Sequence, residues 1–354
     1  MTTSRAILLA AAALLVWFAL DLLLLVFTGV LLAVFLRTIA CWVSAVTGLS
    51  LRWSLLGVVL AITGGLVLAG WLYAPRLAEQ SDQLTETLPQ ALSDLTSWLR
   101  QYSWGRWVLA QLPSGASESG DVVQPAKRAL GGMISIGVGV LVVIFTGLYL
   151  AAEPAPYVRG LLRLVPPRSR RRVAETMYVI AHVLRWWLVG QALAMLLVGL
   201  AMGLGLAAIG VQLALLLGVL AGLFEFVPFL GPLLALGPAL LLALTVSTKT
   251  AAYVVVLYGL VQTLESYVVT PLVQRKALEL PPVLTITAQV GLSWAAGPLG
   301  LLVAVPLVAA SMVVVEMLYV KDRLRDRIRP EFEDVARKQV AEEEDGVLRG
   351  LLPS

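Results

Sequence analysis

The chain has 354 residues, 59% of them hydrophobic and 14% charged, with a mean hydropathy of +0.88. A soluble fold of this length buries far less apolar surface, so the composition excludes a soluble globular protein and indicates an integral membrane protein. The net charge of +4 does not indicate nucleic-acid binding, because the arginines gather at the ends of apolar runs, where they set membrane orientation. The single cysteine and single histidine argue against a metal site, and we expect no metal and no cofactor.

Residues 1–75 are expected to hold three transmembrane helices. Apolar runs cover residues 6–20 and 22–36, with only Asp21 between them, and a third run covers residues 53–73. A bilayer core of roughly 30 Å requires about 20 such residues, fewer or more where a helix is interfacial or tilted. Arg5 followed by the apolar run at residues 6–20 resembles a signal peptide. Because the run at residues 22–36 follows after only one residue, we expect a retained helical hairpin instead.

Residues 76–128 form a polar insert that we place outside the cytoplasm. Its leucines recur at spacings of three and four residues, as on one face of an amphipathic helix: Leu84, Leu88, Leu92, Leu95 and Leu99. A stretch rich in serine and glycine at residues 113–120 is typical of a flexible connector. The insert is therefore predicted to be an extracytoplasmic helix that lies on the outer surface or packs against neighbouring subunits.

Residues 129–186 combine a fourth apolar span with a basic helical segment. Between residues 154 and 186 there are seven arginines and one acidic residue, Glu175, and basic segments next to spans stay on the cytoplasmic side. Counting spans from this segment places the N-terminus in the cytoplasm, together with the charged tail at residues 321–354.

The long apolar stretches at residues 211–246 and 283–319 must each cross the membrane an even number of times if both termini are cytoplasmic. Each is therefore expected to be a hairpin, made of two full spans or of a re-entrant loop, which gives about eight transmembrane helices in all. The residues at their tips end or kink helices: Pro228, Gly231 and Pro232 in the first, and Gly297, Pro298 and Gly300 in the second.

The transport core at residues 187–320 shows an inverted pattern. The span at residues 187–209 runs outward and precedes a hairpin from outside, whereas the span at residues 251–270 runs inward and precedes a hairpin from inside. Secondary transporters use inverted repeats with interrupted helices to build a central site. The sequence thus predicts an all-α polytopic membrane protein whose broken or re-entrant hairpins meet at a midplane site with alternating access.

Glu225 is the only charged residue between Trp186 and Thr248. A carboxylate inside an apolar run, beside helix-breaking residues, is typical of an intramembrane ion or solute site, although a glutamate can also cap or hydrogen-bond a broken helix. Gln262 and Glu265 share one face of the next span, where they could line the path or hydrogen-bond a neighbouring helix. The predicted path comprises Gln191, Glu225, Pro228, Gly231, Pro232, Gln262, Glu265, Gly297 and Pro298.

The chain lacks the motifs of enzymes that work in membranes. It has no P-loop of the GxxxxGK type and no HExxH zinc motif, and its apolar runs hold neither a Ser/His pair nor paired aspartates. We therefore expect a protein that is not an enzyme and whose energy source is an ion gradient or none.

Several stretches of the second half follow a known pattern in order and spacing. They are GVLAGLFEFVPFLGP from Gly218, QTLES from Gln262, the pair Thr270-Pro271, Pro282, and GLLVAVPL from Gly300. In these stretches the chain resembles the AI-2E family of bacterial transporters, which is named for export of the quorum-sensing signal autoinducer-2.

This resemblance implies a multi-pass protein of the bacterial inner membrane, with about eight spans, that assembles as a homo-oligomer such as a pentamer. It implies a secondary transporter, ion-coupled or facilitative, that exports a small signal molecule such as autoinducer-2 or a related solute, with H⁺ or Na⁺ as coupling ion. Its surroundings are the lipid bilayer, and nucleic acid is not a partner. Two alternatives stay open: a Na⁺(Li⁺)/H⁺ antiporter, and a membrane scaffold or regulator that transports nothing.

Overall fold

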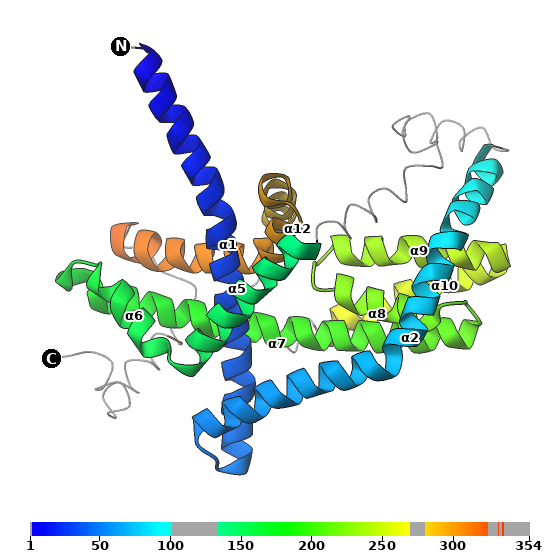
Figure 1. Ribbon diagram of the computed structural model, residues 1–354, viewed down its shortest axis with the longest axis horizontal. Coiled ribbons are helices and arrows are strands. Elements are labelled where there is room, and N and C mark those ends of the chain that lie inside the picture. The colour runs from blue at the N-terminus through cyan, green and yellow to red at the C-terminus, as the bar shows by residue number, and fades with distance from the viewer. Residues whose placement is uncertain (1, 101–132, 270–279, 325–331, 333–334, 336–354) are drawn as a thin grey trace. The chain divides into compact units, whose positions relative to one another are not determined.

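The computed structural model describes residues 2–100, 133–269, 280–324, 332 and 335, and every regular element among them is a helix (Figure 1). This confirms the all-α class for the described part of the chain. The elements in chain order are α1 (Thr2–Thr47), α2 (Leu51–Arg100), α5 (Met133–Ala152), α6 (Pro154–Arg163), η2 (Pro167–Ser169), α7 (Arg170–Ile209), α8 (Ala214–Phe224), α9 (Leu230–Val246), α10 (Thr248–Leu264), η3 (Glu265–Val269), α12 (Pro282–Val314) and η4 (Val315–Leu324).

Several of these helices are long and apolar enough to cross a bilayer. Four candidate spans lie in the described residues: Leu20–Thr47, Leu51–Tyr73, Pro167–Ile209 and Pro282–Lys321. A fifth is the pair Gly139–Ala152 and Pro154–Arg163, which is bent by 91° at the Pro154 that starts α6, because proline removes a backbone donor and crowds the preceding turn. Length and composition thus support a polytopic membrane protein with four or five candidate spans in these residues.

The N-terminal segment differs from its prediction. α1 runs without interruption from Thr2 to Thr47, so the helical hairpin expected around Asp21 is wrong. A reversal between two helices needs a loop of a few residues, and a lone aspartate is disfavoured in a helix interior by less than about 1 kcal/mol. With neither proline nor glycine between Thr2 and Thr28, nothing in this segment terminates the helix.

The polar insert begins as a continuation of the preceding apolar span. α2 extends from Leu51 to Arg100, so the helix predicted over the leucine repeat is present, but it is not a separate element. Residues 101–128 of the insert lie outside the described residues.

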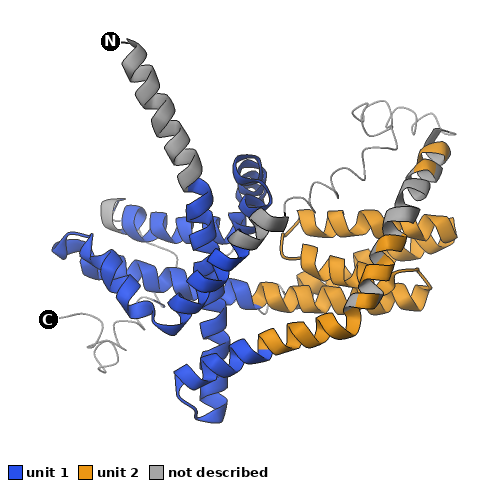
Figure 2. Ribbon diagram, viewed as in Figure 1, with its two compact units in different colours: residues 1–61, 138–189, 273–354 blue, residues 62–137, 190–272 orange. Residues whose placement is uncertain are grey.

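The chain divides into two compact units (Figure 2). Unit 1 comprises residues 1–61, 138–189 and 273–354, and unit 2 comprises residues 62–137 and 190–272. α7 contributes its first half to unit 1 and its second half to unit 2. Most of the predicted path residues fall in unit 2, and only the bend at Gly297 falls in unit 1.

The core of unit 2 is built from the second half of α7 with α8, α9 and α10. α9 packs against both α8 and α10, and the buried residues at the centre of this core include Met202, Leu206, Leu217, Ala239 and Val254. α7 and α8 approach with glycine against glycine: a Cβ on Gly218 would lie 2.5 Å from the Cα of Gly203, and one on Gly222 would lie 3.0 Å from the Cα of Gly199. Such pairs of small residues let membrane helices pack backbone to backbone.

The core of unit 1 joins α1, the first half of α7 and α12. Leu24, Leu31, Leu184, Leu188 and Val303 form one buried cluster. Near the N-terminus of α7, the Arg172 guanidinium donates hydrogen bonds to the Glu175 carboxylate at 2.9 Å and to the Met317 carbonyl at 2.8 Å. Arg172 therefore connects the start of α7 to the π-helical segment η4.

Candidate functional site

The turn between α8 and α9 carries the acidic residue that the sequence singles out. α8 ends at Phe224 and α9 begins at Leu230. Gly231 lies so close to the carbonyl oxygen of Phe224 that a Cβ at this position would collide with it. Phe229, just before α9, has φ +67°, a value that non-glycine residues rarely adopt. The tight glycine contact and this strained residue together allow the chain to reverse over a short turn.

Both prolines of this turn lie where proline is tolerated. Pro228 falls between the helices, and Pro232 falls in the first turn of α9, where the N–H groups have no partner within the helix. The predicted break at Pro228, Gly231 and Pro232 is therefore present in unit 2.

Glu225 follows directly on α8 and is buried, with only 4% of its surface exposed. Its backbone carbonyl accepts a hydrogen bond from the side-chain amide of Gln191 on α7. Its carboxylate oxygen Oε2 is buried and has no hydrogen-bond partner among the described residues. Gln191, and not the carboxylate, thus satisfies the backbone at the end of α8, which leaves this carboxylate oxygen available to a ligand.

A second carboxylate, that of Glu265, belongs to the same unit. The Gln262 side-chain amide lies 3.3 Å from Glu265 Oε2, and the Ser266 hydroxyl lies 3.3 Å from the same oxygen. The Glu225 and Glu265 carboxylates interact electrostatically. Glu265 opens the π-helical turn η3, and such turns widen a helix and often mark functional sites.

Tyr258 on α10 is a residue that the sequence reasoning missed. It is 8% exposed, its hydroxyl has no hydrogen-bond partner among the described residues, and it interacts electrostatically with Glu225. A signal was available, because Tyr258, Gln262 and Glu265 follow at spacings of four and three, which places them on one helical face. A tyrosine within an apolar run is more readily interpreted as part of the core.

Gln80 on α2 is the second residue that was missed. Its side-chain oxygen accepts a hydrogen bond from the backbone N–H of Leu216 at 3.1 Å. Leu213, at the N-cap of α8, gives no side-chain hydrogen bond, and the first N–H groups of a helix need partners from outside it. Gln80 supplies one, so the polar continuation of α2 helps to hold the helix that ends at Glu225.

The second predicted bend lies in unit 1. α12 is interrupted at Ala296 and Gly297, whose backbone angles are not helical, and Gly297 has φ +60° and ψ −145°. Gly300 lies against the carbonyl oxygen of Leu292, again with no room for a Cβ. Figure 1 shows the two parts of α12 running in different directions. The predicted break at Gly297 and Pro298 is therefore present.

Four of the predicted path residues thus lie in unit 2 as two hydrogen-bonded pairs: Gln191 with the backbone carbonyl of Glu225, and Gln262 with the carboxylate of Glu265. Two carboxylates, two amides and the Tyr258 hydroxyl offer both hydrogen-bond acceptors and donors, and of these residues Glu225 and Tyr258 are buried. This chemistry suits a cation or a small polar solute. Among the described residues, no group of three or more His, Cys, Asp or Glu side chains is arranged to hold a metal ion.

The apolar helices, the broken helix and the buried carboxylate define a polytopic helical membrane protein of the transporter class. The model of the AI-2E transporter family matches residues 6–319, and the chain belongs to that family.

Three relatives are named for a proposed transport role. YueF of Bacillus subtilis (strain 168) is 24% identical over 298 residues, which cover 78% of this chain and 81% of YueF. YrrI of the same organism is 29% identical over 151 residues, or 43% of each protein. MT0215 of Mycobacterium tuberculosis (strain CDC 1551 / Oshkosh) is 36% identical over 138 residues, or 37% of each protein. The match to YrrI thus spans less than half of that relative's length.

Proposed function

We propose that the chain is a secondary transporter that exports a small solute, a signal molecule such as autoinducer-2 or a related compound, across the bacterial inner membrane by alternating access. The observation that carries this proposal is the buried Oε2 of Glu225, which has no hydrogen-bond partner among the described residues. Burying a carboxylate oxygen without a partner is unfavourable by several kcal/mol. A cation, a proton or a donor group of the solute would offset that energy.

Helix lengths support re-entrant hairpins at both bends. α8 has 11 residues and would extend roughly 16 Å, about half of the thickness of a bilayer core. The first part of α12, residues 282–295, would extend roughly 21 Å. Neither first arm is long enough to cross, so we propose that each hairpin turns back within the membrane.

A Na⁺(Li⁺)/H⁺ antiporter is the second candidate. It is favoured by the electrostatic interaction between the Glu225 and Glu265 carboxylates, because two acidic groups that affect each other can exchange a metal cation for protons. In this case the same residues serve, but no organic solute moves.

Counterflow in proteoliposomes tests the function. Vesicles with the purified full chain are loaded with unlabelled autoinducer-2, Na⁺ or Li⁺ and diluted into the labelled form of the same probe. We expect exchange of at least one probe, and its identity separates solute export from antiport. If the wild-type protein exchanges none of these, the scaffold alternative gains support.

Glu225→Gln removes the charge with little change in shape. We expect it to reduce exchange to the level of protein-free vesicles, because the ligand loses its charged partner. Glu153→Gln is the matched control, since Glu153 is 68% exposed and pairs only loosely with Arg52 at 3.9 Å. Wild-type exchange by Glu225→Gln would remove this carboxylate from the mechanism.

The membrane arrangement is also a proposal. The arginines of α6 and of the start of α7 favour a cytoplasmic position, and we propose that the C-terminal tail lies on the same side. With α1 as one helix and both hairpins re-entrant, the proposed crossings are α1, α2, α5, α7 and α10. They are fewer than the eight spans expected from the sequence, and they place the N-terminus on the opposite side from the tail. The candidate span Leu51–Tyr73 is almost wholly exposed in the single chain, which leaves it available to lipid or to a second copy. We propose a homo-oligomer, and mass measurement of the detergent-extracted protein would give its subunit number.

A further inference from the structure

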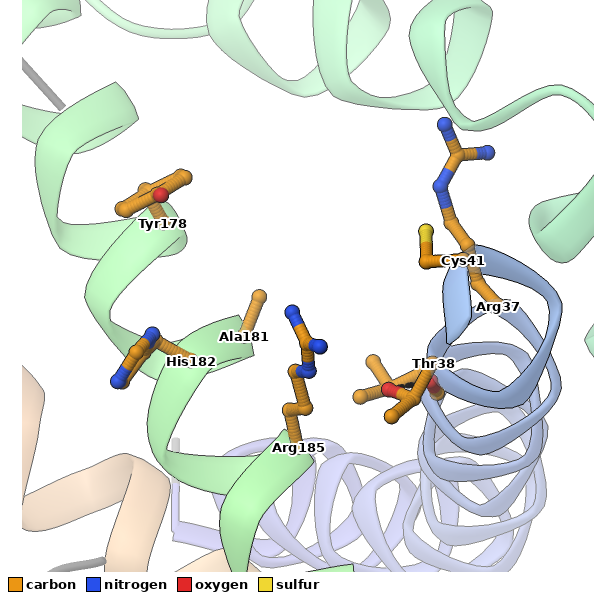
Figure 3. A pocket seen from close by; sticks show the side chains of 8 residues that line it. Arg37, Thr38, Cys41, Tyr178, Ala181, His182 and Arg185 are labelled. Atoms are coloured by element: carbon orange, nitrogen blue, oxygen red, sulfur yellow. Dashed lines mark hydrogen bonds between the residues drawn. The ribbon is translucent and has the colours of Figure 1, made fainter. Parts of the chain in front are cut away.

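A cleft of about 190 Å³ opens between α1 and α7 within unit 1. Arg37, Thr38 and Cys41 line it from α1, and Tyr178, Ala181 and Arg185 line it from α7 (Figure 3). Val34 and His182 complete the lining, so none of the lining residues is acidic. Two arginines therefore share a cleft whose lining offers them no counter-charge.

Of the two arginines, Arg185 gives the stronger indication of an anion ligand. Its Nε is buried and has no hydrogen-bond partner among the described residues. Figure 3 shows its guanidinium projecting into the space between the two helices. The guanidinium carbon lies 5.8 Å from the centroid of the Trp186 ring. A buried donor of a charged group without an acceptor is unfavourable, and an anion in the cleft would provide the acceptor.

Arg37 lines the cleft from α1, and part of its guanidinium group is held by a hydrogen bond. One of its terminal nitrogens donates to the Ala151 carbonyl at 3.0 Å, which fixes the side chain at the cleft. A guanidinium has five N–H donors, so one bond leaves others for a ligand. A phosphate in the cleft could therefore accept hydrogen bonds from either guanidinium group.

We propose that this cleft binds a phosphate group, supplied either by an anionic lipid headgroup or by a free phosphate compound. The planar fork of arginine matches the geometry of phosphate oxygens. Arg185 is also followed by Trp186 and Trp187, residues that favour the headgroup layer of a membrane. Basic pockets between membrane helices are known to bind anionic lipid headgroups.

The residues that line this cleft are not among the predicted path residues. The cleft belongs entirely to unit 1, whereas Glu225 and its neighbours belong to unit 2. A phosphate bound there would join α1 to α7, the helix that continues into the transport core. The inference does not depend on what the chain transports.

Cys41 provides a direct test, because it is the only cysteine of the chain and it lines the cleft. The rate of its alkylation by uncharged N-ethylmaleimide is measured on the full chain in neutral detergent during titration with short-chain phosphatidylglycerol. A parallel titration uses inorganic phosphate, with chloride at matched ionic strength as the reference. We expect either phosphatidylglycerol or inorganic phosphate to slow the alkylation of Cys41 in a saturable way. The one that does so shows whether the cleft binds a lipid headgroup or a free phosphate compound.

Arg185→Gln should weaken this protection by about tenfold or more, as expected for loss of a hydrogen bond to a charged group. Arg168→Gln is the matched control, since it removes the same charge from an exposed position outside the cleft and should leave the protection unchanged. Ala181→Leu fills the cleft and keeps both arginines, so it should weaken protection even if Arg185→Gln does not fold. Equal protection in Arg185→Gln and Arg168→Gln, or no protection by either phosphate source, would overturn the proposal.

Discussion

The two bends, one at the end of α8 and one within α12, reverse the chain by the same backbone device. Each has one residue with positive φ before the second arm, Phe229 at +67° and Gly297 at +60°. Each also has a glycine pressed onto a carbonyl of the first arm, Gly231 on Phe224 and Gly300 on Leu292. By these contacts, Gly231 in the first bend corresponds to Gly300 in the second. By the Gly-Pro pairs of the sequence, at residues 231–232 and 297–298, Gly231 would instead correspond to Gly297.

The bends differ in what they place at the turn. The first carries a buried carboxylate and a phenylalanine in a conformation that glycine favours, while the second has a glycine there and no charged residue between Leu292 and Gly300. A strained non-glycine residue raises the free energy of the folded state by about 1–3 kcal/mol and is found most often at functional sites. Strain and buried charge thus coincide at the first bend and not at the second.

The largest expected effect tests the shared device. Gly231→Ala and Gly300→Ala each force a Cβ into a backbone carbonyl, so each should lower the free energy of unfolding by roughly 3 kcal/mol or more. Chemical unfolding in detergent measures this. Gly237→Ala and Gly291→Ala are the matched controls, one in each hairpin, because nothing lies within 4 Å of a Cβ at either position. If only one bend responds, the two do not share the device.

The next effect tests the carboxylate at the first bend. Glu225→Met replaces a buried, unpartnered charge by an apolar side chain of similar length, which should raise the free energy of unfolding by about 1–3 kcal/mol. The same unfolding titration applies, and transport should be lost. A decrease in stability would instead favour the alternative in which the glutamate holds the broken helix together.

A smaller effect tests the strain directly. Phe229→Gly should raise the free energy of unfolding by about 1 kcal/mol, since relief of the positive φ outweighs the greater freedom of glycine in the unfolded chain. The lost side chain contributes little because Phe229 is 48% exposed. Gly297→Ala should have the opposite sign, with a loss of about 2 kcal/mol. Equal signs for the two variants would show that the bends do not differ in strain.

The smallest effect concerns how the first arms begin. α12 starts at Pro282, whose missing N–H needs no partner, whereas α8 relies on Gln80 from a distant helix. Gln80→Ala should therefore lower the free energy of unfolding by about 1 kcal/mol, measured as above. Glu79→Ala, at an exposed position of the same helix, serves as the comparison, and an equal loss there would deny Gln80 this role.

The sequence predicted what depends on composition and local chemistry. Apolar content fixed the membrane class, and the breaks at Pro228 and Gly297 follow from backbone properties of proline and glycine that act within a few residues. The prediction of a hairpin at Asp21 was wrong because a polar residue between two apolar runs was interpreted as a loop, although aspartate can lie within a helix.

What depends on distant contacts could not be inferred in this way. Gln80 and Leu216 are 136 residues apart, and no local pattern links them. The sequence singled out Glu225, Gln262 and Glu265 by their polarity in apolar runs, and their role in a transport path stays a prediction. Tyr258 shares their helical face but was passed over because aromatic residues are ordinary in membrane cores.

The glycine contacts between α7 and α8 restrict how the first hairpin can move. Where Gly218 and Gly222 touch Gly203 and Gly199, main chain rests on main chain, and no pliable side chain lies between them to absorb a displacement. A shift of the hairpin tip must then pull the second half of α7 along with it. We therefore expect the first hairpin and the second half of α7 to move as one body, with the pivot outside the glycine contacts between α7 and α8.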